Sequence, residues 1–249
     1  ANVEGFEALE KKVKDFSPES MEEISGVPAD YVREFSRIYA NSENSIIFWG
    51  MGVSQHVHGT DNSRCLIALS LITGHVGRPG TGLHPLRGQN NVQGASDAGL
   101  IPMVYPNYQS VEDVDIRNFF EDKWGRSLDP TKGLTVVEIM NRIVSSQMFG
   151  MYVMGENPAM SDPDQNHARL ALSKLQHLVV QDIFFTETAW FADVIFPASA
   201  QPEKAGTYTN SNRQVQIGFP VRKTPGEAKQ DWKLIVDLAK RCGLNWDYK

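Results

Sequence analysis

The residues best suited to chemistry lie in one run from His84 to Gly99, with the sequence HPLRGQNNVQGASDAG. The run carries one guanidinium, on Arg87, together with four carboxamide side chains and three glycines. Carboxamides present a donor beside an acceptor, which suits the mixed edges of pterin and guanine rings. Because no helix or strand period runs through it and glycine allows close backbone approach, the sequence predicts a ligand-binding loop that includes Gly88 and Gln89.

Arg87 stands among small and amide residues, with no carboxylate near it in the sequence. A guanidinium in that setting can hold a carboxylate or phosphate through two parallel hydrogen bonds, whereas lysine would supply charge without orientation. We therefore treat Arg87 as a candidate anion-binding residue. The alternative is a solvated or locally bridged arginine.

The elements before this run form a predicted helix–strand–loop–helix unit. A helix over 28–40 leads into a buried strand over 45–49, and a second helix, capped by Thr60 or Asp61, ends at Gly74. Open α/β sheets bind ligands beyond the carboxyl ends of their strands. The candidate cofactor-binding residues at this first strand end are Gly50, Met51, Gly52 and Gln55.

A segment over 75–108 shows little periodicity and is predicted to join this unit to a second one. The second unit alternates helices with short apolar strands, which predicts an α/β fold with Rossmann-like parallel sheets covered by helices. Its predicted helices cover 135–147, 164–175 and 186–191, and its strands cover 151–154, 178–181 and 193–196. We expect residues 1–89 to be part of a first α/β domain and 90–200 a second. Residues 201–249, an irregular and helical segment, would link to a neighbouring domain.

Two successive strands of the second unit end in polar residues that should lie at one edge of the sheet. Gly155, Glu156, Asn157 and Pro158 follow the first strand, and Gln181 and Asp182 end the next one. A carboxylate such as Asp182 can accept paired donors from guanine or bind ribose hydroxyls. Acid–glycine turns also occur as plain strand ends, and Thr186 fits helix capping as well as cofactor contact.

Composition excludes several classes of function. The 249 residues are 41% hydrophobic, enough for a sizeable core, and the net charge of −6 leaves no basic stripe for nucleic acid. No apolar stretch is long enough for a membrane span and no leader pattern opens the chain, so we expect no membrane insertion and a cytoplasmic location. Cys65 and Cys242 are predicted to be buried free thiols, and neither they nor the pair His56 and His58 have metal-ligand spacing.

The run from His84 to Gly99 also strongly resembles one in the large subunits of molybdenum or tungsten bis(molybdopterin guanine dinucleotide) oxidoreductases, especially formate dehydrogenase alpha subunits. The resemblance spans nearly the whole chain. Its other anchors follow in order at 49–55, 154–158, 181–189 with 192–197, and 203–210 ending at Arg213.

This resemblance implies roles for particular residues. In the family, the arginine at the position of Arg87 lies beside the metal and binds the formate carboxylate, so Arg87 is the implied catalytic residue. His84 is implied to be a loop residue, because the family's catalytic histidine lies beside the metal ligand. Residues matching the family pattern E-x-x-G-T-x-x-N-x-x-R are implied to contact cofactor or pack between domains, and they are Glu203, Thr207, Asn210 and Arg213.

The resembled enzymes also carry an upstream 4Fe-4S cluster and a Cys or Sec metal ligand, neither of which has a counterpart here. We therefore interpret the chain as an internal piece of a larger polypeptide, inactive and without cofactor or metal when isolated. The complete enzyme would hold the bis-guanine dinucleotide cofactor with Mo or W and oxidise formate, with its remaining domains and electron-transfer subunits as partners. The alternatives are another molybdopterin oxidoreductase, such as a nitrate reductase, and a non-catalytic nucleotide-binding domain.

Overall fold

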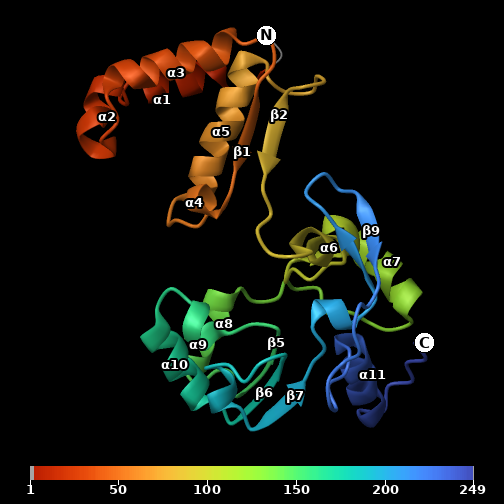
Figure 1. Cartoon of the computed structure of the whole chain (residues 1–249). Helices are drawn as coiled ribbons and strands as arrows, with labels where there is room; N and C mark the ends of the chain where they lie inside the picture. The colour runs from red at the N-terminus through yellow and green to blue at the C-terminus, as the bar shows by residue number, and fades with distance from the viewer. Residues whose placement is uncertain (1–2, 249) are drawn as a thin grey trace. The chain divides into compact units, whose positions relative to one another are not determined.

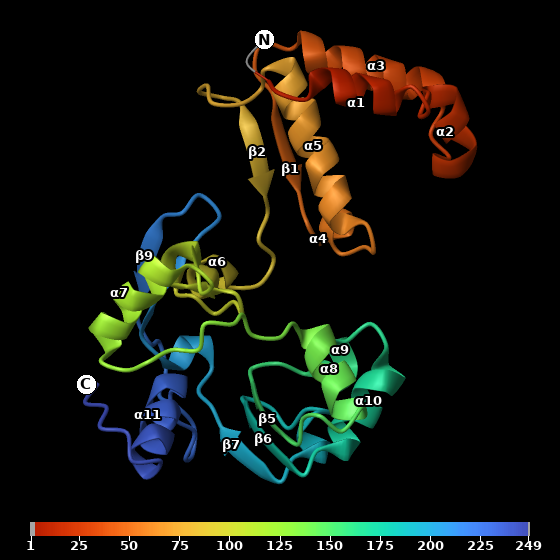
Figure 2. The same cartoon turned by 180° about the vertical axis from the view of Figure 1, so that it is seen from behind.

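The computed structural model describes residues 3–248, which divide into two compact units, residues 3–92 and 93–248 (Figure 1). Both units mix helices with small parallel sheets, so the predicted α/β class is confirmed. Figure 2 shows the same elements from behind. Among the described residues, no helix combines the length and the apolar character needed to cross a membrane.

The first unit is built on a two-stranded parallel sheet. Its elements are α1 (Phe6–Val13), α2 (Pro18–Ser25), α3 (Ala29–Asn41), β1 (Ile46–Trp49), α4 (Met51–Ser54), α5 (Gly59–Thr73) and β2 (Gly82–Pro85). Helix α5 runs beside the two strands (Figure 1). The buried His75, just after α5, donates from Nε2 to the carbonyl of Tyr39 at 2.9 Å and so ties α5 to α3.

Three predictions for this unit are wrong. Strand β1 is partly exposed rather than buried, since Ile46 and Phe48 are 45% and 58% exposed. The segment 75–108 is not a continuous loop, because it contains β2 and all of α6 (Val92–Asp97). The strand β2 has no period of its own and is defined by its pairing with β1. Helix α5 begins at Gly59, before Thr60 and Asp61, because the chain turns sharply there: a Cβ on Gly59 would lie 1.7 Å from the Ser54 carbonyl oxygen.

The second unit centres on a three-stranded parallel sheet in the order β5-β6-β7. Its remaining elements are α7 (Val114–Trp124), α8 (Val136–Val144), α9 (Pro158–Ser161), α10 (Gln165–Lys174) and α11 (Asp231–Arg241). The sheet strands are β5 (Gly150–Met154), β6 (His177–Asp182) and β7 (Val194–Pro197). Smaller pieces are β3 (Val104–Tyr105), β4 (Gln109–Ser110), β8 (Gly206–Thr209), β9 (Val215–Gly218) and the 3-10 turns η1 (Pro106–Tyr108), η2 (Ala189–Phe191) and η3 (Gln201–Glu203).

Apolar side chains from α10 and the sheet form the main core of this unit. Leu172 of α10 packs with Val153, Leu178 and Val180 of the strands, and all four are almost fully buried. A second cluster joins α8 to α10 through Ile143 and its neighbours. These helices and strands follow the predicted alternation, since each buries one periodic apolar face.

Two features of the structure lie outside the predictions. Helix α7 and the antiparallel pair β8-β9 fall in stretches without a predicted element. Helix α7 begins where the Asp113 side chain accepts the N–H groups of residues 115 and 116, and its Phe120 packs on Tyr105. The prediction that Cys65 and Cys242 are buried is wrong: both thiols are exposed, and Cys242 lies just beyond the end of α11.

Candidate functional site

A cavity of about 400 Å³ lies within the first unit, at the carboxyl ends of β1 and β2. It brings together many of the predicted site residues, even though they come from two segments more than thirty residues apart. Its lining is Trp49, Gly50, Met51, Ser54, Gln55, Ser63, Pro85, Leu86, Arg87, Gly88, Gln89 and Val92.

Strand pairing explains why these segments meet. In the parallel register Trp49 lies opposite Pro85, so both strands end at the same edge. The Leu86 N–H donates to the Trp49 carbonyl at 2.7 Å, which extends the pairing by one residue and places Arg87 directly beyond it. Gly88 follows, and a Cβ there would make ordinary van der Waals contact with Met51 Cε at 3.5 Å.

Two other residues of this unit that the sequence singled out, Gly52 and His84, do not line the cavity. The Gly52 carbonyl accepts a hydrogen bond from His56 Nε2 at 2.5 Å. His84 lies in β2 rather than in a loop, and its ring packs against Phe48 with centroids 5.4 Å apart. Within the described residues, no three His, Cys, Asp or Glu side chains come together as a metal site.

The second group of predicted residues lies at one edge of the sheet in the other unit, as the sequence predicts. Met154 pairs with Gln181, and the Gly155 N–H donates to the Gln181 carbonyl at 2.9 Å. Gly155 adopts a left-handed conformation with φ of 65°, which turns the chain at this edge. Pro158 is buried at the start of α9 and Glu156 is exposed.

Asp182 is the carboxylate at this edge. It is half-buried, and its Oδ1 accepts the N–H of Ile183 at 2.6 Å and that of Phe184 at 3.4 Å. These bonds hold the carboxylate at the strand end. The expectation that this edge and the cavity around Gly50 serve one cofactor stays a prediction, because the two belong to separate units.

Both polar atoms of the Asn157 side chain form hydrogen bonds within the protein. Its Oδ1 accepts from the N–H of Thr188 at 3.0 Å and from the Thr188 hydroxyl at 2.7 Å, and its Nδ2 donates to Glu187 at 2.7 Å. The hydrogen bond from Asn157 lowers the pKa of Glu187. The Thr186 hydroxyl accepts the N–H of Ala189, so Thr186 caps the turn over residues 186–189. Asn157 therefore clamps the loop after β5 to the loop after β6.

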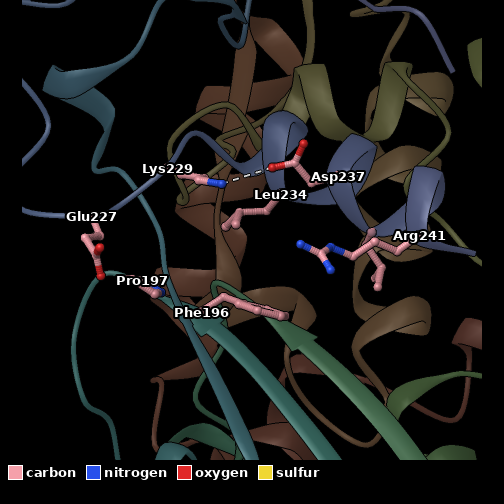
Figure 3. Close-up of a pocket in the computed structure, with 8 residues that line it drawn as sticks. Phe196, Pro197, Glu227, Lys229, Leu234, Asp237 and Arg241 are labelled. Carbon is pink, nitrogen blue, oxygen red and sulfur yellow. Dashed lines mark hydrogen bonds and ion pairs between the residues drawn. The ribbon is translucent and has the colours of Figure 1, made fainter.

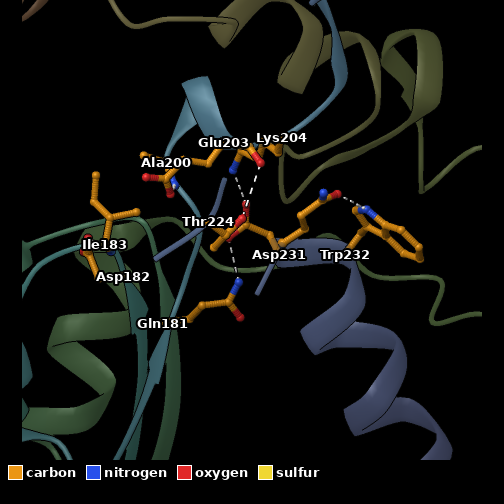
Figure 4. Close-up of polar contacts among 10 residues, drawn as sticks. Gln181, Asp182, Ile183, Ala200, Glu203, Lys204, Thr224, Asp231 and Trp232 are labelled. Carbon is orange, nitrogen blue, oxygen red and sulfur yellow. Dashed lines mark hydrogen bonds and ion pairs between the residues drawn. The ribbon is translucent and has the colours of Figure 1, made fainter. Parts of the chain in front are cut away.

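Gln181 is also engaged, and it is fully buried. Its Oε1 accepts from the Tyr152 hydroxyl at 2.5 Å. Its Nε2 donates to Asp231 at 2.7 Å (Figure 4). Burial and the nearby charge of Asp231 raise the pKa of Tyr152. Sequence reasoning missed these partners, because Asp231 lies fifty residues further along the chain.

The candidates after β7 lie around η3 and the β8-β9 hairpin. Glu203 is buried, and its carboxylate accepts the Ala200 N–H at 2.9 Å and pairs with Arg222 at 3.4 Å. Asn210 accepts the Gln214 N–H in the hairpin turn, where Arg213 is exposed with φ of 64°. Thr207 is an exposed residue of β8.

A further cavity, of about 550 Å³, lies between the end of β7 and α11 (Figure 3). No sequence motif indicated it, because it forms where α11 packs beside the sheet. Phe196 and Leu234 contribute apolar surface, and Lys229 pairs with Asp237 at 3.0 Å across it. The complete lining is Phe196, Pro197, Glu227, Lys229, Leu234, Asp237, Leu238 and Arg241.

Comparison with known proteins gives consistent matches. Residues 13–241 match the molybdopterin oxidoreductase family. The F420-dependent formate dehydrogenase subunit alpha of Methanocaldococcus jannaschii is 47% identical over 241 residues, covering 97% of this chain and 35% of that protein. Formate dehydrogenase H of Escherichia coli is 39% identical over 249 residues, covering 100% of this chain and 35% of that protein.

The chain thus spans about a third of the length of these relatives. Among solved structures, acetylene hydratase from Pelobacter acetylenicus has a similar fold, with a TM-score of 0.71 and 20% sequence identity. The match covers 97% of this chain and 36% of that one. At that identity the likeness shows the fold alone.

Proposed function

Because the chain belongs to the molybdopterin oxidoreductase family and is homologous to formate dehydrogenase alpha subunits, we propose that it is the central cofactor-binding part of such a subunit. The complete polypeptide oxidises formate to carbon dioxide and holds bis-molybdopterin guanine dinucleotide with Mo or W. The observation that carries this proposal is the cavity at the ends of β1 and β2, which places Arg87 beside Gly50, Gln55 and Gln89.

The donor chemistry of this cavity fits a pterin with a small anion beside it. Gln55 and Gln89 offer carboxamides for the mixed donor and acceptor edges of the pterin, and Gly50 and Gly88 allow its close approach to the backbone. Arg87 can hold both oxygens of formate through its planar fork, which orients the formate C–H bond.

Asp182 is proposed to recognise the guanine of the dinucleotide. A carboxylate accepts the paired N1–H and N2–H donors of guanine, and the hydrogen bonds from the backbone after β6 fix its orientation. The exposed Glu156 can bind ribose hydroxyls at the neighbouring strand end. Thr207 and Arg213 are second-rank candidates for contacts with the cofactor.

Formate oxidation releases two electrons and one proton. When bound, the metal cofactor supplies the electron acceptor. The described residues bind and orient formate and cofactor, while the metal ligand, the proton-accepting base and the iron–sulfur relay belong to other parts of the polypeptide. Electron-transfer subunits are the proposed partners, and the cytoplasm is the proposed location.

The test is to purify the full-length polypeptide after expression with its cofactor-assembly machinery. We expect formate-dependent dye reduction, near-stoichiometric Mo or W, and GMP released on acid hydrolysis. Nitrate reduction without formate oxidation would instead assign the chain to another branch of the family. Lack of both metal and guanine nucleotide would favour a non-catalytic domain.

A further inference from the structure

Four side chains form a continuous polar network in the second unit. Tyr152 on β5 donates to Gln181 on β6. Gln181 donates to Asp231 at the start of α11, and Lys204, just after η3, pairs with Asp231 (Figure 4). This polar network therefore joins two strands, a helix and the segment before β8, although its members are far apart in sequence.

The chemistry of these groups fixes the direction of every bond. Lysine only donates and a carboxylate only accepts, so Gln181 must present its amide nitrogen to Asp231 and its oxygen to Tyr152. The Lys204–Asp231 pair is also partly sheltered, with about 28% and 29% of the side chains exposed. The Lys229–Asp237 pair, which involves the same helix, is about half exposed.

Gln181 connects this polar network to the loop after β5 and the loop after β6. Its backbone carbonyl accepts the N–H of Gly155, where the loop after β5 begins. The next residue is Asp182, whose own carbonyl accepts the N–H of Ala198 beyond β7. A displacement of Gln181 would therefore shift the loop after β5 and the proposed guanine carboxylate together.

We propose that Asp231, acting through Gln181, is a positioning residue that sets the two strand-end loops for the guanine nucleotide of the cofactor. This inference rests on the proposed function of Asp182. It assigns the side chain of Gln181 to positioning rather than to direct cofactor contact, because both of its polar ends are occupied within the protein. It also gives a role to α11, which no sequence motif singled out.

The experiment compares Asp231→Asn with Asp237→Asn in the full-length polypeptide. Asparagine keeps the shape and one acceptor oxygen, so the fold should persist while the ion pair with Lys204 is lost. Hydrogen exchange is measured in cofactor-free protein on the peptide covering residues 181–185. We expect about tenfold faster exchange in Asp231→Asn and no change in Asp237→Asn, as a weakened charge-assisted bond implies.

A second readout is the GMP released per polypeptide from each loaded protein. We expect a several-fold loss for Asp231→Asn and none for Asp237→Asn, while the formate KM of the loaded fraction stays unchanged because Arg87 belongs to the other unit. Gln181→Leu, which removes both side-chain bonds, should reproduce the loss.

Equal exchange rates and equal GMP content in the two asparagine variants would overturn the inference. Faster exchange with full GMP content would also overturn it, by reducing Asp231 to a purely structural role. Absence of guanine nucleotide from the wild-type protein would instead refute the proposed function, and the exchange measurement would still show whether Asp231 holds the strand end.

Discussion

Replacing Asn157 with alanine should destabilise the second unit far more than its half-buried position suggests. Its Oδ1 is the acceptor for both the N–H and the hydroxyl of Thr188, and Thr188 is completely buried. Alanine would leave these donors without an acceptor in a site closed to water. An unsatisfied buried group costs roughly 1–3 kcal/mol, so the variant should lose about 2–5 kcal/mol of unfolding free energy.

The assay is urea unfolding followed by intrinsic fluorescence, to which the exposed Trp190 near this clamp contributes. Glu187→Ala is the matched control, because it removes the exposed partner of Asn157 and leaves both Thr188 bonds intact. We expect little change in its urea midpoint. An Asn157→Ala midpoint equal to that of the wild type would refute the reasoning, since it would mean that Thr188 finds other partners at no cost.

Three further predictions concern the packing and turns that support the site. Leu172→Ala should cost about 2–5 kcal/mol in urea unfolding, because Leu172 is 1% exposed in the main core; a loss below about 1 kcal/mol would contradict that packing. Gly99→Ala should lower the melting temperature, because Gly99 has φ of 88° and a Cβ would lie 2.7 Å from Pro106 N; an unchanged melting temperature would contradict this geometry. Hydrogen bonds from the Thr135 backbone and hydroxyl lower the pKa of Glu138 below 4.5, so this carboxylate stabilises α8 above that pH and the contribution is lost as pH falls. The urea midpoint should therefore drop less between pH 7 and pH 4 in Glu138→Gln than in the wild type.

The fold could be predicted where an element carries its own apolar period. Helix α10 and strand β6 bury regular faces, so their positions follow from the residues alone. Strand β2 carries no such period, since it exists through its pairing with β1, and the β8-β9 hairpin buries little of either face. Elements of that kind are set by tertiary pairing, which local sequence does not encode.

The features of the candidate site likewise divide into those that the sequence could predict and those that depend on distant partners. The shared edge of β5 and β6 could be predicted, because the direction of parallel strands fixes where the residues after them emerge. The meeting of Gly50 and Arg87 in one cavity could not be predicted, because it depends on β2, a strand that the sequence did not indicate. The engagement of Gln181 and Asn157 could not be predicted, since their partners lie fifty and about thirty residues away. Their cofactor contacts, like those of the other candidates, stay predictions.

The most direct test of the central claim is formate oxidation by the full-length polypeptide carrying Arg87→Lys, measured together with its metal and GMP content. Lysine keeps the positive charge but cannot form the two parallel hydrogen bonds of a guanidinium. The kcat/KM for formate should therefore fall about a hundredfold or more at wild-type cofactor content. Arg64→Lys is the control, because Arg64 pairs with Asp61 on the exposed side of α5 and does not line the cavity. Wild-type kinetics in Arg87→Lys would remove Arg87 from the substrate site, and lost metal would make it a cofactor anchor; either result would contradict the account.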